Sequence, residues 1–184
     1  MPLLSGLKHT SFSLRLSFFV AKYFYIYLME TAFIKTPLGT AKITGDAKGI
    51  ASISVLEEGD ISTKIPKELK LAITQLQDYF EGKRTHFDFK LQPQGTEFQQ
   101  KVWQALLDIP FGKTCSYMDL SKKLGDVKAI RAVASANGKN PLWIVVPCHR
   151  VIGTDGSLTG YAGGLWRKKW LLEHENPVKQ QSLF

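Results

Sequence analysis

The feature that most constrains the fold is a change in the spacing of apolar residues along the chain. Between residues 32 and 56, apolar and polar residues alternate and are separated by glycine and proline turn signals, which is typical of short strands. From Pro66 onward, apolar residues recur three and four positions apart, which is typical of helices that bury one face. Strands followed by helices predict a mixed α/β (α+β) fold in two domains.

The same patterns divide the chain into segments. Residues 30–92 are expected to form a small strand-rich α/β domain with a supporting role, in which residues 66–81 form a helix that ends at Gly82. Residues 93–176 are expected to form a second, largely helical domain. Residues 177–184 remain as a C-terminal tail.

Residues 1–29 match no targeting or membrane segment well. Arg15 and Lys22 interrupt the apolar stretch over residues 14–28, so no run approaches the ~18–20 residues that a bilayer span needs. Acidic residues are absent before Glu30, which leaves an organellar presequence open. We expect a loosely ordered N-terminal extension and no membrane-spanning segment.

The charge of the chain is unevenly distributed. The formal net charge is +8, of which residues 1–100 carry +2 and residues 101–184 carry +6. A basic C-terminal half favours a polyanionic partner, either nucleic acid or a membrane surface. The two cysteines, Cys115 and Cys148, exclude a disulfide framework and favour a reducing compartment, so we expect the cytoplasm, or the nucleus in a eukaryote.

The second domain is predicted to begin with two capped helices. Thr96 and Gln99 have the spacing of a capping box ahead of an apolar stripe. Ser116 is placed to cap the next helix, with Asp119 in its first turn. The stripe of the first helix consists of Phe98, Val102, Trp103, Leu106 and Leu107.

A third helix is predicted over residues 127–136, with Asn137-Gly138 as its stop signal. It follows the tight turn Gly125-Asp126 and carries Lys128 and Arg131. Two short helices joined by such a turn have the outline of a helix-turn-helix. The alternative is a pair of packing helices of the kind found in any small domain, and the local positive charge favours DNA binding.

A cysteine and a histidine follow an apolar run. Residues 142–146 are predicted to form a buried strand that delivers Cys148 and His149 after Pro147. A basic environment beside a histidine favours a thiolate nucleophile. Adjacent side chains of a strand point to opposite faces, so either the chain turns sharply after Pro147 or a water relays the proton. Glu175 is the candidate carboxylate that orients the histidine.

Two other interpretations of these residues stay open. A single buried cysteine is commonly an inert part of the core. Cys115, Cys148, His149 and His174 could meet at a zinc ion, although neither CxxC nor HxxxH spacing occurs in the chain.

The segment Pro-Cys-His-Arg-Val at residues 147–151 resembles the active-site signature of the O6-alkylguanine-DNA alkyltransferases, also called methylated-DNA–protein-cysteine methyltransferases. The resemblance covers roughly residues 30–176 and is most specific over residues 96–176. Further blocks that are similar, in the family's order and spacing, lie at residues 111–117, 129–133, 140–141, 159–165 and 168–175.

The resemblance implies a winged-helix-like helix-turn-helix domain that both binds DNA and accepts the alkyl group. Cys148 matches the alkyl acceptor. His149 and Glu175 match a relay in which the glutamate orients the histidine, and the histidine deprotonates the thiol through a water. Asn140 matches the asparagine that joins the helix-turn-helix to the active-site segment. Tyr117 matches a tyrosine that crowds the target phosphate and donates a proton to guanine.

The resemblance also implies a base pocket and a DNA contact surface. Arg131 matches the finger that enters the base stack, and Lys128 is expected to contact DNA beside it. Trp143 is larger than the residues expected at its position and is expected to change the pocket width, whereas Ala162 replaces a common serine whose backbone N–H suffices. The expected pocket residues are Val151, Tyr161, Ala162, Lys168 and Trp143.

The implied activity is stoichiometric, irreversible transfer of an alkyl group from O6-alkylguanine, and in some cases O4-alkylthymine, to Cys148. The implied partner is double-stranded DNA, bound through its minor groove by a monomer. No cofactor is expected, and no metal, because the zinc site of some members needs N-terminal cysteines that this chain lacks. A non-catalytic lesion recogniser and a cysteine hydrolase are the alternative functions.

Overall fold

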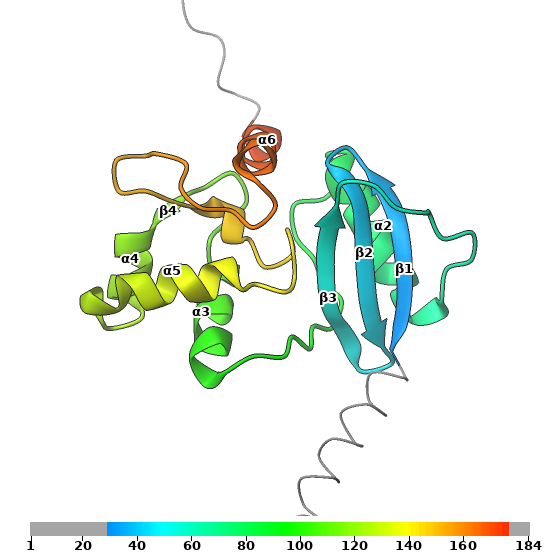
Figure 1. Ribbon diagram of the computed structural model, residues 1–184, viewed down its shortest axis with the longest axis horizontal. Helices are drawn as coiled ribbons and strands as arrows, with labels where there is room; N and C mark the ends of the chain where they lie inside the picture. The colour runs from blue at the N-terminus through cyan, green and yellow to red at the C-terminus, as the bar shows by residue number, and fades with distance from the viewer. Residues whose placement is uncertain (1–28, 177–184) are drawn as a thin grey trace, which may run out of the picture.

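The computed structural model describes residues 29–176, which form a sheet domain and a helical domain that lie side by side (Figure 1). The expected N-terminal extension and C-terminal tail fall almost entirely on residues 1–28 and 177–184, outside the described residues. Between residues 29 and 176, no helix combines the length and the hydropathy that crossing a bilayer requires.

The sheet domain is built on three antiparallel strands in the order β1-β2-β3, as the alternating pattern predicted. Helix α2 packs on one face of this sheet (Figure 1) and ends at Phe80, two residues before Gly82, whose φ of +71° suits glycine. Gly39 in the first hairpin also has a positive φ, and a Cβ there would lie 2.3 Å from the Leu56 carbonyl oxygen. The elements are β1 (Glu30–Thr36), β2 (Gly39–Asp46), β3 (Gly49–Leu56), a 3-10 turn (Lys67–Leu69) and α2 (Lys70–Phe80).

The helical domain begins with the capped helices that the sequence predicted. Thr96 and Gln99 form a complete capping box, and the Ser116 hydroxyl accepts a hydrogen bond from the backbone N–H of Asp119. The Trp103 indole donates to the Ala136 carbonyl at 2.8 Å and so joins α3 to α5. The elements are α3 (Glu97–Leu107), β4 (Cys115–Ser116), α4 (Tyr117–Lys123), a 3-10 turn (Val127–Ala129), α5 (Ile130–Gly138), a 3-10 turn (Cys148–Arg150), β5 (Val151–Ile152) and α6 (Leu165–Glu175).

Two details of the helices differ from the sequence predictions. Phe98 and Leu107, at the two ends of the α3 stripe, are each 39% exposed, because only the middle of the helix faces the core. Helix α5 includes Asn137 and ends at Gly138, with Lys139 as its C-cap. The predicted stop signal therefore lies inside the last turn of the helix.

The predicted buried strand over residues 142–146 is wrong. Only Leu142 forms a bridge, to Ile53 of β3, and the chain then folds back so that the Val146 N–H donates to the Leu142 carbonyl at 2.9 Å. Ile144 has a φ of +67°, which a β-branched residue rarely adopts. All five side chains are buried, and a short apolar run predicts burial equally well for a strand and for a packed turn.

Helix α6 joins the two domains. The buried Arg167 guanidinium donates to the Leu38 carbonyl at 2.7 Å and pairs with Glu57 at 3.0 Å, and both partners belong to the sheet domain. The Tyr79 hydroxyl of α2 reaches Glu175 at the other end of α6. The last turn of α6 is therefore held by both domains.

Candidate active site

Cys148 lies at the start of a 3-10 turn and is 7% exposed. The Asn140 side-chain amide donates to the Val146 carbonyl at 2.7 Å and to the Cys148 thiol at 3.1 Å. Its Oδ1 accepts from the Leu142 backbone N–H at 2.9 Å. Asn140 thus holds the folded-back segment on which the cysteine sits.

The environment of the thiol disfavours its ionisation. Burial raises the pKa of the Cys148 thiol, and the Asn140 hydrogen bond and the Lys168 charge offset only part of that effect. The expectation that these surroundings favour a thiolate is therefore wrong. Because the resting cysteine is a thiol, a neighbouring base has to remove its proton before it can act as a nucleophile.

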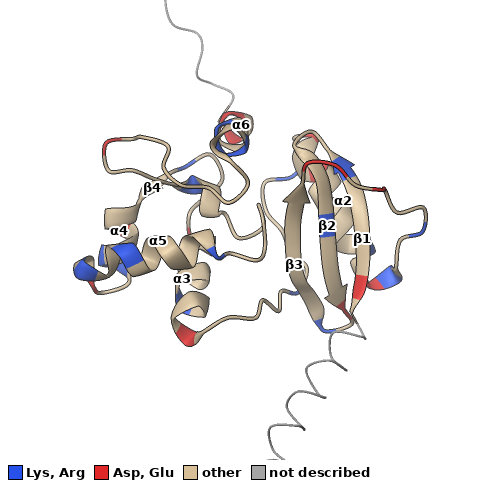
Figure 2. Cartoon of the chain, in the orientation of Figure 1, with Lys and Arg blue, Asp and Glu red and all other residues tan. Residues whose placement is uncertain are grey.

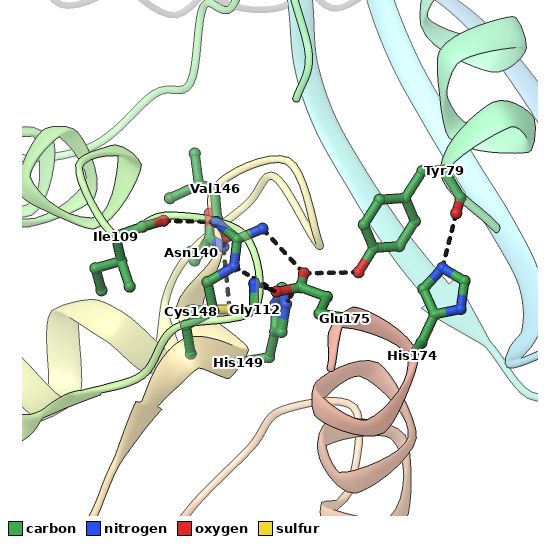
Figure 3. A network of polar contacts seen from close by, with 10 residues as sticks. Tyr79, Ile109, Gly112, Asn140, Val146, Cys148, His149, His174 and Glu175 are labelled. Carbon is green, nitrogen blue, oxygen red and sulfur yellow. Dashed lines mark hydrogen bonds and ion pairs between the residues drawn. The ribbon is translucent and has the colours of Figure 1, made fainter. Parts of the chain in front are cut away.

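Glu175 is the centre of the polar network beside this cysteine (Figure 3). Its Oε1 accepts from Tyr79 and His149 at 2.8 Å each and from Arg150 Nη2 at 2.9 Å. Its Oε2 accepts from Arg150 Nε at 2.8 Å and from the Gly112 N–H at 3.2 Å. Burial alone would raise the pKa of Glu175, but the hydrogen bonds and charges of His149 and Arg150 lower it to about 2. The carboxylate is ionised at any physiological pH.

The ionised carboxylate determines which nitrogen of the His149 ring carries the hydrogen. Since Glu175 only accepts, the ring carries its hydrogen on Nε2, and Nδ1 keeps the lone pair. Burial, together with the charges of Arg150 and Lys168, lowers the pKa of His149 although Glu175 acts to raise it, so the ring is neutral at neutral pH. Nδ1 is buried and has no hydrogen-bond partner among the described residues. A neutral ring with an unpartnered Nδ1 is the form of histidine that can accept a proton.

The chain does turn sharply after Pro147, which is one of the two geometries that the sequence left open. In residues 29–176 no direct hydrogen bond joins the Cys148 thiol to the His149 ring, so a relayed proton stays a prediction.

Two members of the network had no predicted role. Arg150 belongs to the signature segment, and its guanidinium binds the Ile109 carbonyl at 2.6 Å as well as Glu175. Tyr79 comes from the sheet domain, and the His174 ring binds its backbone carbonyl at 2.7 Å. Nothing in the local sequence marks Tyr79, because its partners lie about a hundred positions further along the chain.

A pocket of about 580 Å³ opens between α5 and the glycine-rich loop of residues 153–164, which precedes α6. Of the five expected pocket residues, Tyr161 and Ala162 line it, whereas Val151, Lys168 and Trp143 do not. The full lining consists of Tyr117, Ile130, Arg131, Ala134, Gly138, Thr159, Gly160, Tyr161 and Ala162.

Of the remaining expected residues, Lys168 holds the loop that lines the pocket, whereas Trp143 lies in the contact between the domains. The fully buried Lys168 ammonium donates to the carbonyls of Val151 and Thr159 at 2.7 and 2.8 Å and so anchors the glycine-rich loop. Trp143 packs against Phe80 of the sheet domain, with ring centroids 6.1 Å apart. Its large side chain is accommodated in the contact between the domains.

Arg131 is the one basic residue among the described residues that line the pocket, and further lysines lie near it in the chain. Arg131 lies in the first turn of α5 and is exposed, and Lys128 is exposed in the 3-10 turn just before it. With Lys122 and Lys123 they place positive charge at the α4–α5 end of the domain (Figure 2). Neither Lys128 nor Arg131 forms an ion pair within residues 29–176.

The zinc interpretation gains no support from the geometry. Among residues 29–176, no three His, Cys, Asp or Glu side chains are grouped as a metal site. Cys115 lies on β4, where burial raises the pKa of its thiol, and its Sγ contacts the Ser116 carbonyl at 3.4 Å.

Comparison with known proteins identifies relatives of both domains. Residues 29–93 match the ribonuclease-like domain, and residues 97–177 the DNA binding domain, of 6-O-methylguanine DNA methyltransferase. The methylated-DNA–protein-cysteine methyltransferase of Methanosarcina barkeri is 44% identical over 149 residues, which are 77% of this chain and 94% of that protein. The Mycobacterium tuberculosis protein of that name is 44% identical over 147 residues, 77% and 89% of the two chains.

Two solved structures are similar to this chain in both sequence and fold. The crystal structure of Mycobacterium tuberculosis O6-methylguanine methyltransferase has a TM-score of 0.74 and 42% identity, covering 84% of this chain and 96% of its own. That organism's OGT in complex with DNA also has a TM-score of 0.74, at 44% identity and with 80% and 92% covered. The resemblance and the mixed α/β fold are thereby confirmed, and the chain belongs to the 6-O-methylguanine DNA methyltransferase family.

Proposed function

We propose that this chain repairs O6-alkylguanine in DNA by moving the alkyl group to the sulfur of Cys148, once per protein molecule. The observation that carries this assignment is a buried thiol that follows Pro147, precedes a neutral histidine and interacts with Tyr161, which lines the pocket that Arg131 borders. Family membership supports the same activity. A cysteine hydrolase would need a separate oxyanion site, of which the sequence gives no sign.

The proposed reaction uses these residues in three roles: base, nucleophile and proton donor. His149 Nδ1 takes the thiol proton through a water, while Glu175 holds the ring and stabilises its charge. The thiolate of Cys148 attacks the alkyl carbon, the bond from that carbon to O6 breaks, and guanine keeps the electron pair. Tyr117 gives guanine a proton, which makes it a better leaving group. The thioether product has no electrophilic carbonyl for water to attack, so the acceptor is not regenerated.

The lesion lies on the pairing edge of guanine, so the nucleotide has to leave the duplex, at a cost of a few kcal/mol. The pocket beside Tyr161 and Ala162 receives it, and Arg131 fills the vacated stack. Minor-groove binding suits this task because that groove discriminates little between sequences. Lys128 contributes phosphate contacts, and the chain acts as a monomer on double-stranded DNA in the cytoplasm or nucleus.

Intact-mass measurement after incubation with an O6-methylguanine duplex tests the assignment. We expect a single adduct that makes the protein heavier by one CH₂, maps to Cys148, and does not increase when more substrate is added. Cys148→Ser should form no adduct but still bind the lesion, because a serine hydroxyl is hardly ionised at neutral pH. Cys115→Ala should react like the wild type. The absence of any adduct would favour a lesion recogniser, and repeated turnover would favour a hydrolase.

A further inference from the structure

Asn137, in the last turn of α5, carries a buried amide that the mechanism above does not use. Its side chain is only 2% exposed. Its Nδ2 lies 3.3 Å from the Tyr117 hydroxyl and 3.4 Å from the backbone carbonyl of Cys148. One amide therefore contacts both the residue proposed to protonate guanine and the backbone of the nucleophile.

The two contacts determine which way the Asn137 amide faces. A backbone carbonyl only accepts hydrogen bonds, so the group that faces Cys148 must be the NH₂ and not the oxygen. In this orientation Asn137 Oδ1 has no partner among the described residues. The NH₂ group then also donates to the Tyr117 oxygen, whose own single hydrogen has to point elsewhere.

The surroundings of Tyr117 are consistent with an oxygen that accepts on its protein side. Burial raises the pKa of Tyr117, and the hydrogen bonds from Asn137 and Thr159 act in the opposite direction by favouring the phenolate. Tyr117 and Thr159 both line the pocket, whereas Asn137 does not. Asn137 thus contacts the Tyr117 oxygen from outside the pocket, and the hydroxyl hydrogen is left to a group inside the pocket.

We propose that Asn137 is a positioning residue that orients Tyr117 as the proton donor and stabilises the phenolate left behind. This inference rests on the proposed function. When the bond from the alkyl carbon to O6 breaks, guanine gains an electron pair and takes the Tyr117 proton, and water later reprotonates the phenolate. The Asn137 hydrogen bond strengthens as its acceptor becomes charged, so it favours the transition state over the ground state.

A double-mutant cycle with free O6-benzylguanine tests the proposal in single-turnover experiments. General acids contribute about 10²–10⁴-fold to a rate, so we expect Tyr117→Phe to slow transfer by about 10²-fold. We expect Asn137→Leu to slow it about tenfold and the double variant to match Tyr117→Phe within about twofold, because Asn137 acts through Tyr117. Losses that multiply in the double variant would overturn the role of Asn137.

The same cycle separates this inference from the proposed function. A wild-type chain that forms no adduct contradicts alkyl transfer itself. Transfer to Cys148 that Tyr117→Phe leaves unchanged contradicts the proton-donor role and, with it, the role of Asn137. The rate constant is the quantity compared, because misfolded molecules reduce the amplitude of a single-turnover reaction and leave its rate constant unchanged.

A second substrate and a matched control exclude a merely structural effect. O6-benzylguanine with an electron-withdrawing group on the purine is a better leaving group, so the loss caused by Asn137→Leu should shrink at least severalfold; an equal loss would overturn the proposal. Gln75→Leu removes another 2%-exposed amide, which binds Asp88 in the sheet domain. It should lower the melting temperature and leave the rate constant unchanged, and a loss as large as that of Asn137→Leu would overturn the proposal.

Discussion

The two sides of Cys148 are built differently. On the relay side, which comprises Tyr79, His149, Arg150 and Glu175, every residue is at most 7% exposed, and both carboxylate oxygens of Glu175 are occupied by donors. On the pocket side, which comprises the nine lining residues, an open volume meets solvent and Arg131 is exposed. On the proposed function, the residues of the proton relay are already in place in the folded chain, whereas DNA is expected to complete recognition. Damage to the relay side should therefore affect any substrate, and damage to the pocket rim should affect duplex DNA.

Glu175→Gln should have the largest effect. The neutral amide no longer compensates the buried Arg150 charge or stabilises the His149 imidazolium, so transfer should fall about 10²-fold or more. Breaking a buried ion pair should also cost roughly 3–5 kcal/mol of stability. Single-turnover rates on duplex and on free O6-benzylguanine measure the first effect, and the two losses should be equal. A loss confined to the duplex would contradict the preformed relay.

Acid should lower the free energy of unfolding that the relay side contributes, over a defined pH range. The folded pKa of Glu175 is about 2 and its ordinary value is 4.5, so its contribution to stability is complete above 4.5 and is lost as the pH falls from 4.5 to about 2. This contribution is on the order of 3 kcal/mol. The pKa of His149 is also lowered on folding, so stability should begin to fall below its ordinary value of 6.5.

Urea unfolding of the wild type and of Glu175→Gln across this range checks the prediction. The difference in unfolding free energy should be largest near neutral pH and narrow as the pH approaches 2. A difference that does not change with pH would show that the carboxylate is not the titrating group.

Tyr79→Phe should have a smaller effect of the same kind. The substitution removes one of the donors to Glu175 but keeps the ring that packs against Phe87 and Phe111. A hydrogen bond to a charged group contributes about 1.5–3 kcal/mol to stability, and the rate should fall severalfold on both substrates. Phe87→Leu, which alters packing alone, should change the melting temperature and not the rate. An unchanged rate for Tyr79→Phe would show that the sheet domain does not contribute to the relay.

Lys128→Ala should have the smallest effect and only on duplex DNA. Removing one phosphate contact should lower the slope of log affinity against log salt concentration by about one and leave the reaction with the free base unchanged. Lys64→Ala removes an exposed lysine of the sheet domain and serves as the control. A reduced reaction with the free base would place Lys128 in the pocket and not at the DNA surface.

Local signals in the sequence predicted much of this architecture. The caps at Thr96 and Ser116 were predictable because a capping residue and its partner lie three positions apart. The pairing of His149 with Glu175 followed from chemistry and from the family resemblance, and the structure brings the two side chains together.

Long-range packing explains what the sequence did not predict. The folded-back path at Ile144 depends on its neighbours in the core, so an apolar run alone suggested a strand. Tyr79 joins the network only because α6 binds the sheet domain. Asn137 was interpreted as a helix stop, since its contacts with Tyr117 and Cys148 are tertiary. The raised pKa of Cys148 reflects burial, which net charge does not reveal.

The ratio of two rates for Arg131→Ala tests the division between the two sides most directly. Arg131 is exposed, lines the pocket, and forms no hydrogen bond or ion pair with the Glu175 network within residues 29–176. Its loss should therefore impair extrusion of the nucleotide and not the chemical step. We expect the second-order rate on an O6-methylguanine duplex to fall at least tenfold and the rate on free O6-benzylguanine to change less than twofold. Equal losses on both substrates would contradict a preformed relay beside a recognition surface that DNA completes.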